Sequence, residues 1–271
     1  MDDLFVIKIG GNVIDNPESL QLFLAQFAAI RGHKILVHGG GKIATQVGEK
    51  LGVASQYING RRITDSETID IVTMVYGGLV NKKVVAGLQA LGCNAIGLTG
   101  ADANIIPATK RPLKTINGET VDFGWVGDID TTKLNADNVQ LLLEAGLTPV
   151  FAPLTHDSAG HILNTNADTI ASTLAVSLSS FYKVRLIYCF EKKGVLEDVN
   201  DDGSVIRNIN KTRYQQLLDE KRLFEGILPK IDNAFAAIDA GVKEVLIGHA
   251  DDLLKNTTEA TEGTLITADE K

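Results

Sequence analysis

The chain has 271 residues, 44% of them hydrophobic, and a formal net charge of −8. This composition is typical of a globular protein, and the negative charge argues against nucleic acid and against an anionic membrane surface as partners. The two cysteines and five histidines show neither C-x-x-C nor H-x-x-x-H spacing, which predicts reduced thiols in a cytoplasmic protein and no metal site built from side chains.

A β-α-β unit opens the chain. Residues 4–9 form an apolar run that predicts a strand, and residues 34–37 predict the next one. Between them, Asn16 and Pro17 mark the start of a helix, whose apolar side chains recur at helical spacing until Gly32 ends it. Strands joined by such a crossover helix lie parallel in one sheet.

A long helix and a hairpin follow. The pattern Thr64-Asp65-Ser66-Glu67 is a capping box, which predicts a helix to about Leu91 with a bend near Gly77-Gly78. Asn117-Gly118 lies between two extended segments and predicts a β-hairpin, inserted within residues 105–126 as a lid.

Strands and helices alternate to the end of the chain. The expected elements after the hairpin are helices at 135–145, 166–178, 211–221 and 229–240 and strands at 148–152, 185–189, 244–247 and 264–267. This order predicts an α/β fold, a three-layer αβα sandwich around a mostly parallel open sheet. Because no Pro/Ser-rich linker interrupts it, we expect two lobes that share the sheet, at 1–180 and 181–271. The uncharged stretch at 84–101 contains several glycines and predicts a helix end, a turn and a strand rather than a membrane span.

Two glycine strings stand one β-α-β unit apart. Each follows an apolar strand, the first as Lys8-Ile9-Gly10-Gly11 and the second as His38-Gly39-Gly40-Gly41-Lys42. Because the carboxyl ends of neighbouring parallel strands meet at one edge of the sheet, both turns belong at the edge where ligands bind. Glycine lets backbone N–H groups surround an anion, so the pair predicts a cradle for a phosphoryl group, with ordinary tight turns as the alternative. Neither string fits the Walker or the G-x-G-x-x-G pattern.

Six motifs, in order along the chain, resemble the signatures of the acetylglutamate kinases, which belong to the amino acid kinase family. They are Lys8-Ile9-Gly10-Gly11, His38-Gly39-Gly40-Gly41, Asn59-Gly60-Arg61-Arg62-Ile63-Thr64, Asn164-Thr165-Asn166-Ala167-Asp168, Lys230 before an alanine-rich helix, and Gly263-Thr264-Leu265-Ile266. The resemblance implies that the chain uses ATP, with Mg²⁺ bound through the ATP phosphates, to phosphorylate the γ-carboxylate of N-acetyl-L-glutamate. That reaction gives N-acetylglutamyl 5-phosphate in arginine biosynthesis.

The resemblance also assigns roles to individual residues. It implies that Lys8 and Lys230 contact the transferring phosphoryl group from two sides and that Asp168, between them, orients both ammonium groups. These charges suit phosphoryl transfer, in which positioning and charge neutralisation carry most of the catalysis. The backbone N–H groups that would hold phosphoryl and carboxylate oxygens belong to Gly10, Gly11, Gly40 and Gly41.

Three further side chains are implied in substrate binding. Arg62 would grip the α-carboxylate of the glutamate with its planar guanidinium, or else form a surface salt bridge, for which the neighbouring Arg61 is the better candidate. Asn164 would meet the acylamino group. Asn166 would bind substrate or cap the helix that carries Asp168.

The nucleotide lobe departs from the family pattern. Where the family usually has Thr/Ser-Asp-Val-x-Gly, this chain has Phe190-Glu191-Lys192-Lys193-Gly194, with Glu191 at the usual Asp position. The two lysines would bind ATP phosphates or form a solvated loop. The residues that the resemblance places at the nucleotide are Glu191, Lys192, Lys193, Gly194, Arg222, Leu223 and Phe224.

The sequence does not decide which acyl group the substrate carries. Acetyl is the default, but residues 152–157 depart from the isoleucine-glycine pair that usually follows the proline. Four residues would bind a second carboxylate, as in N-succinylglutamate, or else would only lie in a loop at the rim of the site. They are Thr155, His156, Lys110 and Arg111. Two different functions also stay open. One is a kinase for another carboxylate, carbamate or nucleoside monophosphate, and the second is a non-catalytic amino-acid sensor of the same fold.

We expect a homodimer that arginine does not inhibit. In arginine-inhibited members an extra N-terminal helix interlaces dimers into a hexamer, whereas here the first strand begins by Leu4. Apolar side chains of the long helix either form the dimer contact or pack in the core. They are Ile71, Val72, Val75 and Leu79.

Overall fold

A single eight-stranded sheet forms the centre of the molecule. The structure is a computed structural model that describes residues 1–269. The strands of this sheet are β1 (Asp3–Ile9), β2 (His33–His38), β5 (Ala95–Leu98), β10 (Thr148–Phe151), β13 (Lys183–Phe190), β14 (Asn208–Ile209), β15 (Glu244–His249) and β16 (Thr264–Ile266). The order of the eight strands is β14-β16-β15-β13-β1-β2-β10-β5, and every neighbouring pair except β15 with β16 is parallel. The predicted mostly parallel sheet is therefore confirmed.

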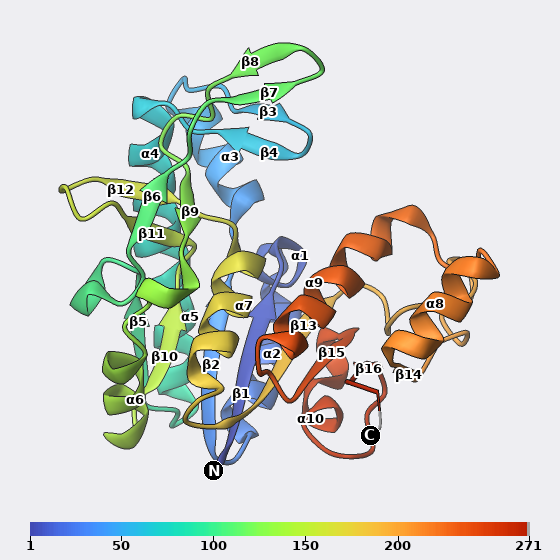
Figure 1. Ribbon diagram of the computed structural model, residues 1–271. Coiled ribbons are helices and arrows are strands. Elements are labelled where there is room, and N and C mark those ends of the chain that lie inside the picture. The colour runs from blue at the N-terminus through green and yellow to red at the C-terminus, as the bar shows by residue number, and fades with distance from the viewer. Residues whose placement is uncertain (270–271) are drawn as a thin grey trace.

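Helices cover both faces of the sheet (Figure 1), which confirms the three-layer αβα sandwich. The α-helices are α1 (Gly11–Asp15), α2 (Pro17–Ala29), α3 (Gly41–Lys50), α4 (Ser66–Val72), α5 (Asn81–Ala90), α6 (Ala136–Glu144), α7 (Ala167–Leu178), α8 (Lys211–Asp219), α9 (Leu228–Asp239) and α10 (Leu253–Asn256). Short 3₁₀ turns lie at η2 (Asp102–Asn104), η3 (Thr131–Lys133), η4 (Glu225–Ile227) and η5 (Ala250–Asp252).

The alternation of side chains along β1 divides the core into two halves. Leu4 and Val6 pack with α6, α7 and α9 on one face, and Ile7 and Ile9 pack with α2, α3, α4 and α5 on the other. Because successive side chains of a strand point to opposite faces, Lys8 falls on the face of Leu4 and Val6. The central strand therefore presents a lysine towards α7 and α9.

The long helix starts one residue later than its capping pattern predicts. Asp65, not Thr64, is the N-cap, and its Oδ1 accepts a hydrogen bond from the backbone N–H of Thr68 at 2.8 Å. Thr64 instead forms a β-bridge with Gly124. The predicted bend near Gly77-Gly78 is a π-helical segment, η1 (Thr73–Val80), between α4 and α5.

The stretch Ser66–Ala90 packs as a core helix. By length and hydropathy it is the one helix in residues 1–269 that could cross a membrane. Ile71, Val72 and Val75 are at most 5% exposed and lie in the core against the sheet. The prediction that these three side chains form a dimer contact is therefore wrong. Only Leu79 of the predicted patch is open to solvent, with 41% exposure.

Four small antiparallel pairs stand beyond the carboxyl edge of the sheet. They are β3 (Gln56–Ile58) with β4 (Arg61–Ile63), β6 (Ala108–Lys110) with β9 (Gly127–Ile129), β7 (Lys114–Ile116) with β8 (Glu119–Val121), and β11 (Leu154–His156) with β12 (Ile162–Asn164). The predicted hairpin at Asn117-Gly118 is confirmed, with φ of 51° and 84° as a two-residue turn requires. This hairpin and β3-β4 lie together at the top of Figure 1, where a small apolar cluster joins them.

Candidate active site

The two glycine turns meet at the carboxyl ends of β1 and β2, as predicted. Ile9 is in register with His38, and the Gly39 N–H donates a hydrogen bond to the Ile9 carbonyl at 3.1 Å. Gly40 has φ of +149°, and a Cβ there would come within 3.1 Å of Tyr76. Only glycine suits that position, because the backbone lies in a region that side chains disfavour and has no free space beside it.

The buried side chain of His38 stabilises the second glycine turn. Its ring is buried, with Nδ1 2.7 Å from the Gly39 carbonyl and Nε2 3.1 Å from Nδ2 of Asn81. Burial lowers the pKa of His38 to about 4. At neutral pH the ring is uncharged, so Nδ1–H donates to the carbonyl while Nε2 accepts from the amide of Asn81.

Two lysines and one carboxylate lie next to the glycine turns. Lys8 Nζ is 2.8 Å from Asp168 Oδ1, and the Lys8 side chain is only 12% exposed. Lys230 comes from α9, and its Nζ lies 3.2 Å from the ring centroid of Phe190. The same ring is 5.9 Å from Lys8 Nζ, so Phe190 lies beside both ammonium groups. The structure thus brings together the three side chains predicted to be catalytic.

The charges of this group act on Lys230. Burial lowers the pKa of Lys230, Asp168 raises it by its negative charge, and the positive charge of Lys8 lowers it again. Two cations at one site repel each other unless an anion lies between them. Asp168 is such an anion, and a bound phosphoryl group would be a second.

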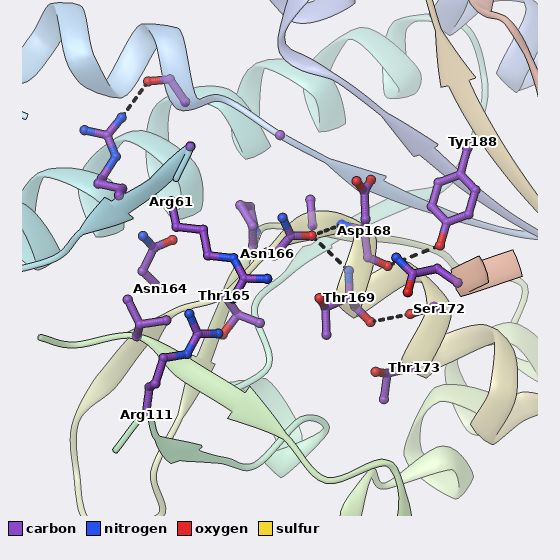
Figure 2. Close-up of a pocket in the computed structure, with 18 of the residues that line it drawn as sticks. Arg61, Arg111, Asn164, Thr165, Asn166, Asp168, Thr169, Ser172, Thr173 and Tyr188 are labelled. Carbon is purple, nitrogen blue, oxygen red and sulfur yellow. Dashed lines mark hydrogen bonds between the residues drawn. The ribbon is translucent and has the colours of Figure 1, made fainter. Parts of the chain in front are cut away.

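A cleft of about 680 Å³ opens beside this group. Its walls come from the second glycine turn, β4, the β6-β9 region, the start of α7 and one side of α9. Figure 2 shows polar side chains that converge on it from these elements. The charged and amide-bearing side chains of the lining include Arg61, Arg62, Arg111, Asn164, Asn166 and Asp168, with the hydroxyl of Thr165 among them.

Arg62 lines the cleft and at the same time holds β4 to α3. Its guanidinium donates hydrogen bonds to the Gly41 carbonyl and to Thr45 Oγ1, each at 2.9 Å, and to Ser55 Oγ. All of these acceptors are uncharged, and the side chain is buried. The predicted contact of Arg62 with a carboxylate is consistent with this position at the cleft wall.

Arg61 points into the cleft (Figure 2). It has no ion pair with any residue among 1–269, so the prediction of a surface salt bridge is wrong. The physical reason is the alternation along β4: because Arg62 turns inward to α3, its neighbour must turn to the other side. Arg61 is exposed there, whereas Arg62 is buried, and both contribute to the cleft lining.

The two asparagines of the Asn164-Thr165-Asn166 motif have different partners. Asn164 Nδ2 donates to Thr64 Oγ1 at 3.0 Å, which leaves its carbonyl oxygen at the cleft. Asn166 Oδ1 accepts from the backbone N–H groups of Asp168 and Thr169 at 2.8 and 3.1 Å. Asn166 therefore caps α7 and fixes the turn that carries Asp168.

Comparison with known sequences agrees with this geometry. The sequence model of the amino acid kinase family matches residues 3–249. The chain belongs to the amino acid kinase family.

Relatives within the family are similar over almost the whole chain. A protein of Cytophaga hutchinsonii named acetylglutamate kinase is 54% identical over 269 residues, covering 99% of this chain and 100% of the relative. An acetylglutamate kinase of Bacteroides fragilis is 53% identical over 246 residues, covering 91% and 92% of the two chains. The solved structure of smu.665 from Streptococcus mutans is 31% identical, with a TM-score of 0.72 and 99% coverage of both chains.

A more distant structure shares the fold. N-acetylglutamate synthase from Neisseria gonorrhoeae, complexed with coenzyme A and N-acetyl-glutamate, has a TM-score of 0.79 at 22% identity. The likeness covers 100% of this chain but 60% of that synthase. At this identity it shows the amino acid kinase fold alone.

The residues of this amino acid kinase that were predicted to bind the nucleotide have different structural surroundings. Lys192 Nζ pairs with Asp202 Oδ1 at 3.0 Å on the surface, and Arg222 pairs with Glu197 and Glu220. Gly194 is buried, and a Cβ there would come within 2.6 Å of Thr264 Oγ1. These contacts fit the solvated-loop alternative for Lys192 and a packing role for Gly194.

The remaining nucleotide candidates differ in exposure. Glu191 borders a second cavity of about 420 Å³ that Gly10, Gly11 and Phe190 also line. Lys193 is exposed, Leu223 packs against the core, and Phe224 is 40% exposed. Glu191 is the nucleotide candidate that shares a cavity lining with the glycine turns.

Three of the four candidates for a second carboxylate lie away from the cleft lining. Thr155 is fully buried, with its hydroxyl 2.8 Å from that of Thr165. His156 accepts from the N–H of Ser158, and Lys110 lies over the Trp125 ring at 4.3 Å. Arg111 alone of the four lines the cleft.

Phe190 and Tyr188 are site residues that the sequence motifs did not assign. Tyr188 lines the cleft, is in register with Lys8, and its hydroxyl is 3.5 Å from the backbone carbonyl of Asp168. Alternation along β13 puts both aromatic rings on the face that carries Lys8. The alternation of residues at the end of that strand would have predicted that both rings lie on the same face as Lys8.

Proposed function

We propose that this chain catalyses the ATP-dependent phosphorylation of the γ-carboxylate of N-acetyl-L-glutamate, giving N-acetylglutamyl 5-phosphate for arginine biosynthesis. The observation that carries the proposal is the Lys8-Asp168-Lys230 group at the two glycine turns, beside a cleft lined with arginine and asparagine. The names of relatives above 50% identity support the choice of substrate.

Charge is the main obstacle to this reaction. A carboxylate oxygen must attack the γ-phosphorus, and the bond to the bridging oxygen of ADP breaks as ADP leaves, so no proton has to move. Both reactants are anions, and catalysis depends on alignment and neutralisation. Lys8 and Lys230 supply positive charge, while the N–H groups of Gly10, Gly11, Gly40 and Gly41 would hold the oxygens.

Substrate and nucleotide would occupy different parts of the molecule. In the proposal, residues 1–180 hold the acceptor, with Arg62 on its α-carboxylate, Asn164 on its acylamino group, and the β7-β8 hairpin as a lid. Residues 181–271 hold ATP. Mg²⁺ would be bound through the ATP phosphates and would neutralise part of their charge.

A coupled assay of ADP release tests the function. Acceptor-dependent turnover with N-acetyl-L-glutamate is expected, and carbamate, free glutamate and nucleoside monophosphates should give none. A binding-only amino-acid sensor would bind its ligand without turnover, and that result would overturn the proposal. Retention of both lysines and of Asp168 at the glycine turns favours the enzyme.

The rate should depend on pH through Lys230. Because burial lowers the pKa of Lys230 below the usual 10.5, the ammonium loses its proton at a lower pH than an exposed lysine does. We expect kcat to fall on the alkaline side as pH rises through that pKa. Asp168→Asn removes the charge that raises the pKa of Lys230, so the alkaline limb should move to lower pH.

The pH profile of kcat for ADP release measures this shift. Asp168→Asn should also lower the maximal rate about ten- to a hundredfold, as for loss of one charged hydrogen-bond partner. Asp219→Asn on the exposed face of α8 is the matched control and should leave the profile unchanged. A limb that stays in place in Asp168→Asn would contradict the assigned coupling.

We propose that the active form is a homodimer in the cytoplasm. Two unpaired buried cysteines, Cys93 and Cys189, suit a reducing compartment. Met74 and Leu79 on η1 are 55% and 41% exposed and supply an apolar contact in place of the buried residues of the same helix.

Light scattering on a sizing column tests the dimer. Met74→Glu combined with Leu79→Glu should shift the protein to monomer, because the contact would bury unpaired carboxylates. Leu141→Glu, at a leucine on α6 that is 62% exposed, should leave the mass unchanged. A monomeric or hexameric wild type would contradict the proposal.

A further inference from the structure

The ammonium of Lys230 lies against an aromatic ring. Its Nζ is 3.2 Å from the centroid of the Phe190 ring, whereas the Nζ of Lys8 is 5.9 Å from the same centroid. The face of an aromatic ring carries negative partial charge, so it attracts a cation that lies over its centre. Lys230 therefore makes a close cation–π contact with Phe190, and the contact of Lys8 with this ring is weaker.

The two lysines of the site have different kinds of partner. Lys8 pairs with the carboxylate of Asp168 at 2.8 Å. Among the side chains that the structure describes, none forms an ion pair with Lys230. Burial lowers the pKa of Lys230, which means that the ammonium form is disfavoured at this position. The ring of Phe190 is a partner that favours the ammonium form.

A ring suits a lysine that must deliver its charge to an anion. A carboxylate in direct contact with Lys230 would neutralise the ammonium, accept one of its N–H donors and repel an incoming phosphate. A ring attracts the ammonium but carries no net charge. The charged groups that act on Lys230 are Asp168 on α7 and Glu191 after β13, which raise its pKa, and Lys8 on β1, which lowers it.

The position of the ring is fixed by the strand that carries it. Phe190 is the last residue of β13 and is in register with His249 of β15. Tyr188 is two residues earlier on the same face, and the two rings stack with centroids 6.2 Å apart and planes at 30°. Phe190 also packs against the hydrophobic core. The ring is therefore in place before any ligand binds, as preorganisation of a charged group requires.

The ring reaches the glycine turns instead of ending in the core. Phe190 is half-buried and lines the cavity of about 420 Å³ that Gly10 and Gly11 also line. At this place the family pattern usually has threonine or serine, neither of which has a ring. The contact between Lys230 and an aromatic ring is thus not part of the motifs on which the resemblance rests.

We propose that Phe190 is a positioning residue for Lys230, whose ammonium its ring holds beside the glycine turns while leaving the charge available to the phosphoryl group. The proposal rests on the kinase function proposed above and adds one residue to it. In this assignment Phe190 contacts no reacting atom and acts only through Lys230.

Kinetics of ADP release with N-acetyl-L-glutamate test this role in three variants. Phe190→Leu and Phe190→Met keep an apolar side chain without a ring, and two such variants are used so that a folding defect in one does not decide the result. We expect both to lower kcat about tenfold. Phe190→Tyr keeps the ring and should stay within about threefold of the wild type. Phe5→Leu, at a half-buried phenylalanine of β1 on the opposite face of the sheet, is the control and should change nothing.

The pH profile of kcat separates positioning from packing. Because the ring favours the ammonium, its loss should lower the pKa of Lys230 and move the alkaline limb to lower pH in Phe190→Leu, but not in Phe190→Tyr or Phe5→Leu. Phe190→Leu combined with Lys230→Ala should be no slower than Lys230→Ala alone, since the ring has no other route to the reaction. Multiplicative losses, or a limb that does not move, would overturn the inference.

An NMR measurement tests the contact without turnover. Protons on Cε of Lys230 lie close to the ring face, so the ring current should shift their signal upfield. The signal is assigned by its absence in Lys230→Ala. We expect the shift in the wild type and in Phe190→Tyr and its loss in Phe190→Leu, and an unshifted wild-type signal would contradict the contact.

The outcomes distinguish this inference from the proposed function. A near-normal kcat in both ringless variants overturns the role of Phe190 and leaves the kinase intact. No turnover of N-acetylglutamate by the wild type overturns the proposed function, and with it the catalytic role of the ring, even where the upfield signal is present.

Discussion

Lys8→Ala should lower kcat for ADP release by roughly 10²–10³, about 3–4 kcal/mol of transition-state stabilisation, as for loss of one preorganised donor. Lys8 is held by Asp168 at 2.8 Å at the end of β1, with its side chain 12% exposed. An ammonium fixed in this way does not have to reorganise when charge develops on the phosphoryl oxygens. The measurement is the initial rate at saturating ATP and acceptor.

Lys8→Arg separates charge from geometry. The guanidinium keeps the positive charge, but its planar fork is larger than an ammonium and does not reproduce the single contact of Lys8 Nζ with Asp168 at 2.8 Å. We expect this variant to be nearly as slow as Lys8→Ala. Lys183→Ala, at the exposed start of the neighbouring strand β13, should keep the wild-type rate. A near-normal kcat in Lys8→Ala would remove Lys8 from the mechanism.

Lys230→Ala should lower kcat by a similar factor, roughly 10²–10³. Lys230 comes from α9, with its Nζ 3.2 Å from the centroid of the Phe190 ring, and in the proposed mechanism its charge would act on the phosphoryl group together with that of Lys8. Its repulsion with Lys8 also lowers its pKa. Removal of Lys230 relieves that repulsion, so we expect the free energy of unfolding to change by no more than about 1 kcal/mol.

A double variant tests whether the lysines act on one group. If both neutralise the same phosphoryl group, Lys8→Ala combined with Lys230→Ala should lose less activity than the product of the single losses, since residues that act as a unit are not additive. Lys255→Ala, an exposed lysine of α10, is the control. Fully multiplicative losses would indicate two independent roles.

Local signals in the sequence were enough for much of the fold. The Asn16-Pro17 helix start, the Asn117-Gly118 turn and the Asn166 cap are set by contacts within a few residues, and all three are confirmed. The two glycine turns were also predictable as neighbours. Parallel strands joined by one crossover must place their carboxyl ends at the same edge.

The direction of side chains required the tertiary structure. Ile71, Val72 and Val75 form an apolar helix face that would suit a partner subunit equally well, and only the position of the sheet shows that they are core. Likewise, Thr155 and His156 follow the strand-ending proline in sequence, but Thr155 is fully buried and neither residue belongs to the cleft lining.

The site itself shows the same division. The sequence by itself determined the residue types, since Lys8, Asp168 and Lys230 stand in motifs that suit phosphoryl transfer, and the structure brings them together. It did not determine which of two adjacent arginines faces the cleft freely. A strand sends neighbouring side chains to opposite sides, and which side is the cleft depends on contacts with α3, far away in the chain. Long-range packing, which no local sequence pattern shows, buries Arg62 against α3 and leaves Arg61 exposed to solvent.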